Sequence, residues 1–125
     1  MGYPPLAHPF RFTMISCAAV NRPRLTVQGD YARPREQELM LAKVRIIVEA
    51  AAHAGCNALV LSAFGCGAYR NPPEKVAAMT AGALVGSPFT EVARCIMDDH
   101  NSRGRHNPKG NLEPFQAAFG TRRDN

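Results

Sequence analysis

The sequence contains no tryptophan, and aromatic residues make up only 7% of its 125 residues. No unbroken apolar stretch approaches the ~18 residues that a membrane span requires, so we expect no integral membrane protein. The first residues, MGYPPLAHPFRF, have no apolar run behind a charged start, and we therefore expect no secretory signal. Basic helices with interleaved aromatic residues are missing as well, which argues against sequence-specific recognition of DNA.

Closely spaced cysteine pairs are also missing. The four cysteines lie far apart, and none belongs to a Cys-x-x-Cys pair; they are Cys17, Cys56, Cys66 and Cys95. Small secreted scaffolds crowd their cysteines for disulfides, and zinc sites need close ligand pairs, so the spacing favours neither. We expect buried free thiols in a cytoplasmic protein that holds no metal ion.

Acidic residues are outnumbered by basic ones. The chain has 15 basic and 10 acidic residues, which gives a formal net charge of +5, and most of the basic residues are arginine. Arginine suits phosphate because its planar guanidinium group donates two parallel hydrogen bonds. The charge therefore indicates either a polyanionic or nucleotide partner or a solvated surface that happens to be basic.

Strand and helix patterns alternate along the chain. The predicted elements are strands over residues 12–20, 57–64 and 89–97 and helices over about 34–54, 73–84 and 112–119. We expect the strand over 57–64 to be buried on both faces and the long helix over 34–54 to be mostly covered. The alternation predicts one α/β domain over residues 1–125, with a mostly parallel or mixed sheet flanked by helices.

The segment between Leu59 and Pro73 carries the clearest chemical signal. A predicted strand runs directly into Gly65-Cys66-Gly67, and a helix starts a few residues later. Ligands of parallel sheets bind at the carboxyl ends of strands, where glycines allow close approach and free amides favour an anion. The alternative is a glycine-rich turn that binds nothing, since neither a Walker sequence nor the dinucleotide fingerprint is present.

The stretch LVLSAFGCGAYRNP, residues 59–72, resembles the Gly-Ala-Trp/Phe-Gly-Cys-Gly-aromatic-x-Asn segment of microbial-type poly(ADP-ribose) glycohydrolases. These enzymes are built on a macrodomain fold, and weaker matches extend the resemblance over about residues 11–119. The family's catalytic signature, a triple glycine followed by Gln-Glu-Glu, is absent from residues 1–35. The chain therefore resembles the C-terminal portion of a macrodomain, without the N-terminal strands and the catalytic loop.

In that family the glycine loop embraces the diphosphate and the distal ribose of ADP-ribose. The resemblance implies that the backbone amides of Gly65, Cys66, Gly67 and Ala68 bind the diphosphate. The Cys66 thiol would be either a reactive thiolate near a helix start or, in the interpretation we prefer, a small apolar residue of the turn.

The resemblance assigns three further residues to the same ligand. Tyr69 would pack against the distal ribose, and Asn71 would hold the loop or touch the ligand. Asn21, at the end of its predicted strand, would lie near the adenosine part. The implied partner is ADP-ribose or an ADP-ribosylated macromolecule, and we expect neither a cofactor nor a metal ion.

The catalytic acid stays unassigned. Cleavage of a ribose–ribose bond needs a carboxylic acid that protonates the leaving oxygen. Glu36-Gln37-Glu38 echoes the family's acidic signature, but no glycine run precedes it, and a favourable charge at a helix start is the preferred interpretation. Asp98 and Asp99 end a predicted strand, and a solvated turn is their preferred interpretation.

We therefore predict a module that binds ADP-ribose, or poly- or mono-ADP-ribosyl groups, without self-sufficient catalysis. Two alternatives stay open. One is an ADP-ribosyl glycohydrolase that uses an unidentified acid or is completed by another chain, and the other is an interaction module that binds no nucleotide. Because the first strands would be missing, one sheet edge would be unpaired, so we expect a homodimer or a partner that completes the sheet.

Overall fold

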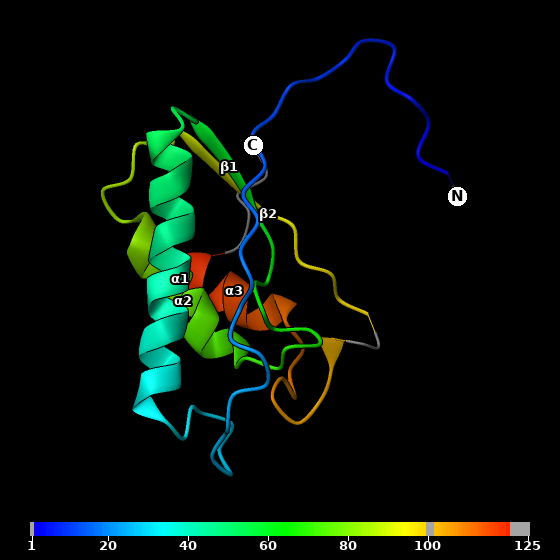
Figure 1. Ribbon diagram of the computed structural model, residues 1–125. Coiled ribbons are helices and arrows are strands. Elements are labelled where there is room, and N and C mark those ends of the chain that lie inside the picture. The colour runs from blue at the N-terminus through cyan, green and yellow to red at the C-terminus, as the bar shows by residue number, and fades with distance from the viewer. Residues whose placement is uncertain (1, 100–101, 121–125) are drawn as a thin grey trace.

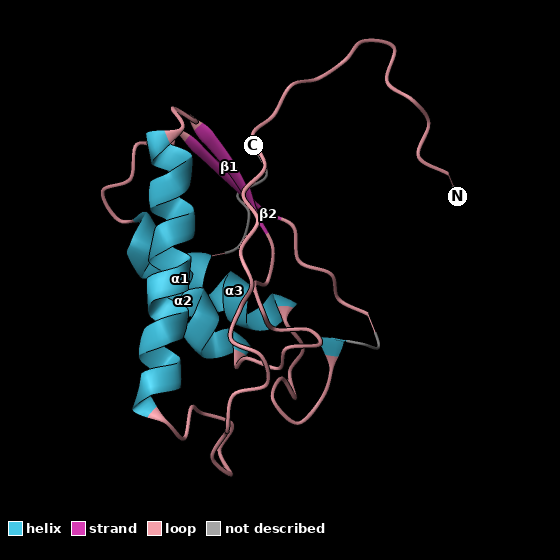
Figure 2. Cartoon of the chain, viewed as in Figure 1, coloured by secondary structure: helices cyan, strands magenta, loops and turns pink. Residues whose placement is uncertain are grey.

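A computed structural model describes residues 2–99 and 102–120, which fold into a small α/β structure (Figure 1). In chain order the elements are α1 (Pro34–His53), β1 (Ala58–Leu61), α2 (Pro73–Leu84), β2 (Glu91–Arg94) and α3 (Leu112–Phe119). β1 and β2 pair in parallel, from Ala58 opposite Glu91 to Leu61 opposite Arg94, and α2 is the crossover between them. The predicted α/β class with a parallel sheet is confirmed, and Figure 2 shows the small share of strand.

Both strands are shorter than the sequence predicts. β1 ends at Leu61 because the backbone then turns: the Phe64 amide donates to the Ser62 carbonyl at 2.9 Å. β2 ends at Arg94, and the Cys95 amide makes one more bond, to the Leu61 carbonyl at 2.7 Å. The prediction that β1 is buried on both faces is wrong, since its residues alternate between exposed and half-buried.

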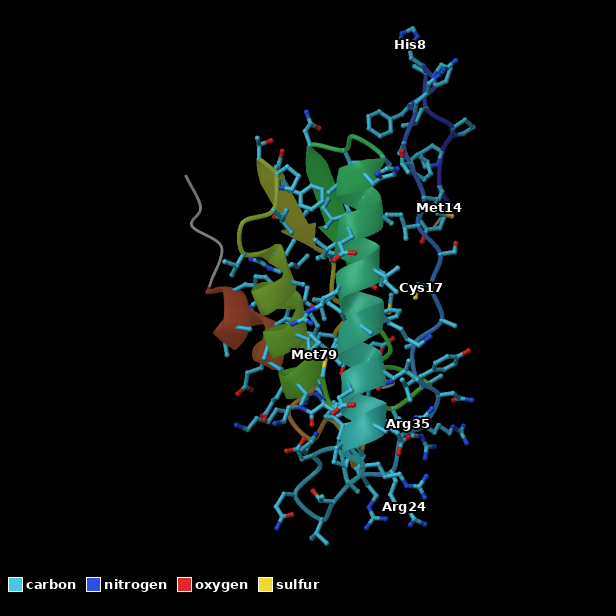
Figure 3. All side chains as sticks on the ribbon, turned by 60° about the vertical axis from the view of Figure 1, so that its left-hand side comes forward. His8, Met14, Cys17, Arg24, Arg35 and Met79 are labelled. Carbon is cyan, nitrogen blue, oxygen red and sulfur yellow. The ribbon has the colours of Figure 1, made fainter. Side chains whose placement is uncertain are left out.

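The predicted strand over residues 12–20 is wrong as well, since this segment has no regular secondary structure. The segment runs beside α1, as the labelled Met14 and Cys17 show in Figure 3. A strand needs a hydrogen-bonded neighbour, and a cavity of about 710 Å³ instead separates residues 10–17 from residues 56–62. We call residues 10–17 together with β1 and β2 the sheet end of the molecule.

α1 begins and ends as its sequence predicts. Pro34 occupies the first turn, where its missing N–H costs no hydrogen bond, and Gly55 follows the helix with a φ of +79°. The prediction that this helix is mostly covered is wrong, because its buried residues form a single stripe. They are Met40, Val44, Val48 and Ala51. Leu39 and Ile46 on the rest of the helix are exposed.

The hydrophobic core lies between the helices and the loops that follow the strands. Its buried members come from α1, α2, α3 and the connecting loops; they are Tyr31, Met40, Val44, Cys66, Val76, Ala77, Met79 and Phe115. Neither strand contributes a hydrophobic residue to this cluster or to the partly buried ones around it, and Arg94 of β2 lies over the ring of Phe119 at its edge, 4.5 Å from the centroid. We call residues 62–72 together with α2 and α3 the loop end, and this end holds the core.

The cysteines differ in exposure although all four are free. Cys66 is buried, Cys17 and Cys56 are half-buried, and Cys95 is exposed. The expectation of four buried thiols is therefore wrong for three of them, because two line the cavity and the third follows the short β2. No helix within residues 2–99 and 102–120 is both long enough and apolar enough to cross a membrane.

Candidate functional site

The loop after β1 is a series of tight turns. The Cys66 amide donates to the Ala63 carbonyl at 3.1 Å, and the Arg70 amide donates to the Gly67 carbonyl at 3.0 Å. Gly65 has a φ of +71°, and a Cβ built there would lie 2.5 Å from the Cβ of Ala19 and 2.9 Å from Nδ2 of Asn71. Only glycine fits this backbone conformation and this space, so Gly65 fixes the path of the loop.

Asn71 holds the loop from inside. Its side chain is fully buried, and its Nδ2 donates to the carbonyls of Val20 at 2.7 Å and Gly65 at 3.0 Å. Its Oδ1 accepts a hydrogen bond of 2.8 Å from the Tyr31 hydroxyl. Because a buried amide with all these partners has one stable orientation, Asn71 positions the loop. The structure thus places Asn71 in the first of its two predicted roles, that of holding the loop.

The exposed part of the loop presents backbone amides that no other group uses. Within residues 2–99 and 102–120, the amides of Gly65, Gly67 and Ala68 donate no hydrogen bond, whereas the Cys66 amide is committed to the turn. Gly67 and Ala68 are exposed, and a Cβ at Gly67 would have no neighbour within 4 Å. Of the four amides that the resemblance assigns to a diphosphate, those of Gly67 and Ala68 are therefore both unpaired and on exposed residues, where an anion can reach them.

Tyr69 and Asn21 lie on either side of one backbone hydrogen bond. The amide of Arg22 donates to the Tyr69 carbonyl at 2.7 Å, which joins the segment that contains Asn21 to the glycine loop. Both Tyr69 and Asn21 are exposed. The structure thus brings all seven predicted site residues to one place, with Asn71 beneath the loop and Tyr69 and Asn21 at its rim.

Two residues of this site carry no signal that sequence reasoning used. Nε2 of His106 donates to the Cys66 carbonyl at 2.7 Å, forty residues away along the chain. Tyr31 comes from the irregular connection between residues 21 and 35, where it forms an isolated antiparallel bridge with Leu25. The available signal for Tyr31 was that it is the only aromatic residue in a connection rich in arginine and proline, and His106 had no such signal.

Burial controls the protonation of the two acidic groups beneath the loop. Burial raises the pKa of the Cys66 thiol to about 12, and Sγ lies 3.5 Å from the Phe64 carbonyl, within donor distance. Burial, and then the nearby Cys66, Asp30 and Glu36, raise the pKa of the Tyr31 hydroxyl above its ordinary value. Both groups are protonated at neutral pH, so Cys66 is a small apolar residue of the turn and not a thiolate.

Three of the candidate catalytic acids, Glu36, Asp98 and Asp99, are engaged in local structure, whereas Glu38 is exposed on the first turns of α1. Oε1 of Glu36 accepts a hydrogen bond of 3.3 Å from the Arg24 amide and lies 3.9 Å from Nε of Arg33. Asp98 pairs with Arg103 at 3.9 Å, and Oδ1 of Asp99 accepts a hydrogen bond of 3.1 Å from the Ser102 hydroxyl. Asp98 also lies beyond the last residue of β2, so the prediction that these acids end a strand is wrong.

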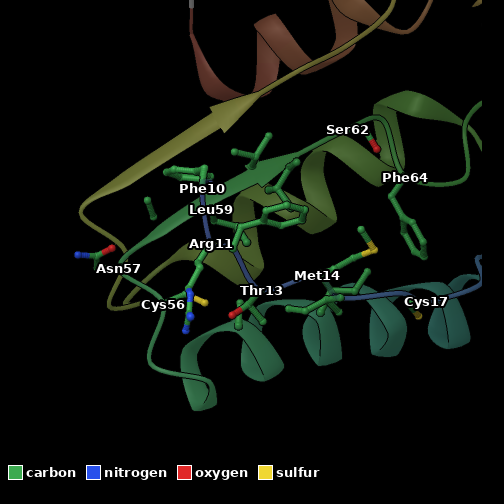
Figure 4. A pocket seen from close by; sticks show the side chains of 17 residues that line it. Phe10, Arg11, Thr13, Met14, Cys17, Cys56, Asn57, Leu59, Ser62 and Phe64 are labelled. Carbon is green, nitrogen blue, oxygen red and sulfur yellow. The ribbon is translucent and has the colours of Figure 1, made fainter. Parts of the chain in front are cut away.

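The cavity of about 710 Å³ is not at the glycine loop. It lies at the sheet end, where side chains of residues 10–17 face those of residues 56–62 across it (Figure 4). Its lining is mostly apolar, from Phe10 and Met14 on one side to Leu59 and Leu61 on the other. A diphosphate needs hydrogen-bond donors, so the glycine loop is the better anion site. In the described part of the chain, no three His, Cys, Asp or Glu side chains gather to hold a metal ion.

A parallel sheet with crossover helix and a glycine loop after the first paired strand defines a macrodomain-like α/β protein. The sequence matches no protein-family model, and none of the curated proteins matches it. Solved structures do match: those of poly(ADP-ribose) glycohydrolase from Deinococcus radiodurans in complex with ADP-ribose. The chain therefore has a poly(ADP-ribose) glycohydrolase-like fold.

The similarity is moderate and partial. One crystal form of the glycohydrolase is 28% identical, with a TM-score of 0.53 over 70% of this chain and 36% of that chain. A second form is 29% identical, with a TM-score of 0.52 over 70% and 36%. A point mutant of the same enzyme is 28% identical, with a TM-score of 0.54 over 71% of this chain and 36% of that chain. The chain thus spans 36% of the length of these structures, consistent with the C-terminal portion that its sequence resembles.

Proposed function

We propose that the chain binds ADP-ribose, or the poly- or mono-ADP-ribosyl group of a modified macromolecule, at the loop from Gly65 to Tyr69. The observation that carries this proposal is the exposed turn with unpaired amides at Gly67 and Ala68, held from beneath by the buried Asn71. The amides bind the diphosphate, and Tyr69 packs against the distal ribose. The ADP-ribose in the matched glycohydrolase structures supports this choice of ligand.

Thermal unfolding with and without ADP-ribose tests the proposal. Ligand at 100 times its dissociation constant stabilises the folded state by about 2.7 kcal/mol. Gly67→Glu places a negative side chain against the diphosphate and abolishes the stabilisation, whereas Gly67→Ala, which meets no atom within 4 Å, retains it. If Gly67→Glu were stabilised as much as the unmodified protein, the assignment of the ligand to this loop would be wrong.

We propose further that the chain alone does not hydrolyse poly(ADP-ribose). The free amides position a substrate, but their N–H groups are far too weakly acidic to protonate the leaving oxygen. Glu36, Asp98 and Asp99 have other partners. Incubation with poly(ADP-ribose) leaves the polymer intact, as measured by the release of free ADP-ribose. Release at an enzymatic rate would favour the glycohydrolase alternative, and loss of that release in Asp98→Asn or Glu38→Gln would name the acid.

We also propose that a second copy of this chain completes the sheet. β1 has β2 on one side only in the described part of the chain, and residues 12–20, which have no regular secondary structure, pair with no strand. Each copy thus carries one open edge and one segment able to pair with an edge, so exchange of this segment joins two copies. Light scattering at micromolar concentration then gives twice the mass of one chain. A monomer with a cooperative melt would show that residues 12–20 close their own edge.

The state of the cysteines supports a proposed cytoplasmic location. All four are free, and the exposed Cys95 has no disulfide partner. Free exposed thiols persist in a reducing compartment. Fractionation of cells that express the full chain, followed by detection of the protein in each fraction, tests this location.

A further inference from the structure

The cavity at the sheet end lies beside an unpaired edge of β1. The Cys95 amide donates to the Leu61 carbonyl at 2.7 Å, so Leu61 directs its carbonyl toward β2. Because the backbone groups of successive residues point to opposite sides of a strand, Ala58 and Val60 direct their N–H and C=O groups away from β2. Within residues 2–99 and 102–120 these groups have no other backbone partner, and both residues line the cavity.

Residues 10–17 supply a second unpaired edge on the opposite side of the cavity (Figure 4). This segment makes no backbone–backbone hydrogen bond within the described ranges. The chain that follows it is fixed to the glycine loop, since Ala19 lies beside Gly65 and the Arg22 amide donates to the Tyr69 carbonyl at 2.7 Å. The segment and β1 therefore run in the same direction, toward the loop end, with the cavity between them.

The cavity has the size of one strand. If residues 10–17 were paired directly with β1, the two backbones would lie about 4.8 Å apart and leave no space between them. At the usual spacings between neighbouring strands and between stacked layers, a strand fills about 160 Å³ per residue. The cavity of about 710 Å³ thus holds about four or five strand residues, and β1 beside it has four.

The walls of the cavity suit an apolar strand. Ile47 and Ala51 of α1 line it on a third side. Phe12 and Met14 on the second edge are 70% and 73% exposed, and large apolar side chains gathered on a surface mark an interaction site. Arg11 also lines the cavity and forms no ion pair within the described ranges. A fitting strand therefore carries apolar side chains toward α1 and an acidic residue beside Arg11.

The described chain offers no spare segment for this place. Residues 3–9 contain Pro4, Pro5 and Pro9, and proline has no N–H to donate inside a sheet. A second copy offers residues 12–20, but exchange of that segment removes the second edge and leaves no cavity to fill. The chain covers 36% of the length of the matched glycohydrolase structures, so most of that polypeptide lies outside the part that they share.

We propose that the cavity binds a β-strand of a different polypeptide, inserted between β1 and residues 10–17. The strand pairs with Ala58 and Val60 on one side and with residues 10–17 on the other, which joins both edges and β2 into one sheet over α1. Backbone hydrogen bonds supply the affinity of such a complex, and alternate side chains supply its specificity. The partner is a protein with an exposed, proline-free segment of alternating apolar residues. This interaction does not depend on the binding of ADP-ribose.

Protection of cysteines from alkylation tests the proposal. Cys17 and Cys56 line the cavity, whereas the exposed Cys95 lies outside it. The probe is a pool of peptides about seven residues long, in which Val, Ile or Phe alternates with Thr and one end carries Glu. The control pool has the same composition with proline at the central position. At submicromolar protein, where mass action disfavours a dimer, iodoacetamide labels the thiols and mass spectrometry measures the rate at each.

The alternating pool at millimolar concentration slows alkylation of Cys17 and Cys56 at least tenfold and changes that of Cys95 less than twofold. The proline pool protects none of the three, because its central residue cannot donate to either edge. Absence of protection by the alternating pool would overturn the inserted strand. Equal protection by both pools would also overturn it, since the cavity would then take apolar molecules without strand pairing.

Two neighbouring isoleucines of α1 give matched variants. Ile47→Glu places a charge in the cavity and weakens peptide protection at least tenfold, whereas Ile46→Glu, at a residue that is 58% exposed and outside the cavity, keeps it within twofold. Val60→Pro removes an N–H from the free edge and no hydrogen bond to β2, so it weakens protection even if Ile47→Glu fails to fold. Equal protection in all these variants would show that the peptide binds elsewhere.

Other occupants and the proposed function give separate outcomes. Protection that appears without peptide and rises with protein concentration would assign the edge of β1 to a second copy and overturn the inference. Gly67→Glu changes the glycine loop and not the cavity, so it keeps peptide protection while it loses ADP-ribose. Failure of ADP-ribose binding and failure of strand binding are therefore measured independently.

Discussion

The loop end and the sheet end of the molecule share the helix α1, yet they differ in how their residues are packed. At the loop end, Cys66 and Asn71 are fully buried, and hydrogen bonds tie the loop to residues 20, 22, 31 and 106. At the sheet end, Val60 on β1 and Phe12 and Met14 beside it are about 70% exposed. The glycine loop is therefore positioned by the helices and connections beneath it, and the two strands contribute little to holding it.

This difference explains how a chain that spans 36% of its matched structures can keep a defined loop. The hydrophobic core joins α1, α2 and α3 to the loop without using β1 or β2. A site that is built on the core keeps its geometry when an adjacent part of a sheet is missing. The comparison predicts that substitutions at the loop end lower stability strongly, whereas matched substitutions in exposed positions do not.

The largest contrast is expected between the two glycines of the loop. Gly65→Ala forces a Cβ to within 2.5 Å of Ala19 at a φ of +71°, so we expect the free energy of unfolding to fall by about 3 kcal/mol or more. Gly67→Ala meets no atom within 4 Å, and its effect stays within about 0.5 kcal/mol. Denaturation with urea measures both. Equal effects would mean that the loop is not held against Ala19.

The next contrast is between two tyrosines. Tyr31→Phe removes the donor to the buried Oδ1 of Asn71, which leaves that oxygen without a partner and costs about 2 kcal/mol. Tyr3→Phe removes the same atom from a fully exposed residue and costs less than about 0.5 kcal/mol. Thermal unfolding of both variants measures the difference. A Tyr31→Phe variant as stable as the unmodified protein would show that water replaces the hydroxyl.

Sequence patterns predicted the elements that local rules determine. The ends of α1 follow from Pro34 and Gly55, and α2 and α3 match their predicted bounds. The glycine loop was found from its motif, and the seven candidate residues do lie together. The contacts that hold the loop were not found, because Tyr31 and His106 reach it from 40 residues away on either side. The extent of strand was overestimated because a strand forms only where a neighbouring strand is available for hydrogen bonding. The apolar residues at 12–20 do not show whether such a neighbour exists.

The pH dependence of stability gives a contrast between two cysteines. Burial raises the pKa of Cys66 from an ordinary 9.0 to about 12, so between these values the unfolded chain loses a proton that the folded chain keeps. The contribution of the Cys66 thiol to the free energy of unfolding is complete below pH 9. Above pH 9 this contribution falls by up to about 1.4 kcal/mol per pH unit. The raised pKa of Tyr31 acts in the same direction.

Denaturant midpoints measured between pH 8 and pH 10.5 give the slope of this decline in stability with pH. Cys66→Ala removes the contribution of the buried thiol and gives a shallower decline, whereas Cys95→Ala, at an exposed residue, keeps the decline of the unmodified protein. Only the slopes are compared, because Cys66→Ala also leaves a small cavity. Identical slopes in all three proteins would mean that the Cys66 thiol reaches solvent, and the loop end would then be less tightly packed than its contacts indicate.

The smallest effect is expected at the sheet end. Val60 lies on β1 with its side chain 70% exposed, and Val60→Thr keeps the β-branched shape that suits a strand, so stability changes by less than about 0.5 kcal/mol. The same replacement at Val76, which is fully buried in α2, places a hydroxyl in the core and costs about 1–3 kcal/mol. Urea denaturation at two protein concentrations compares the variants.

Pairing of a second copy at the edge of β1 leaves the outer face of that strand free, so the small effect of Val60→Thr holds for the monomer and for the dimer. A loss at Val60 equal to that at Val76 would show that this face is covered in solution, and the sheet end would then be an interface and not an open surface.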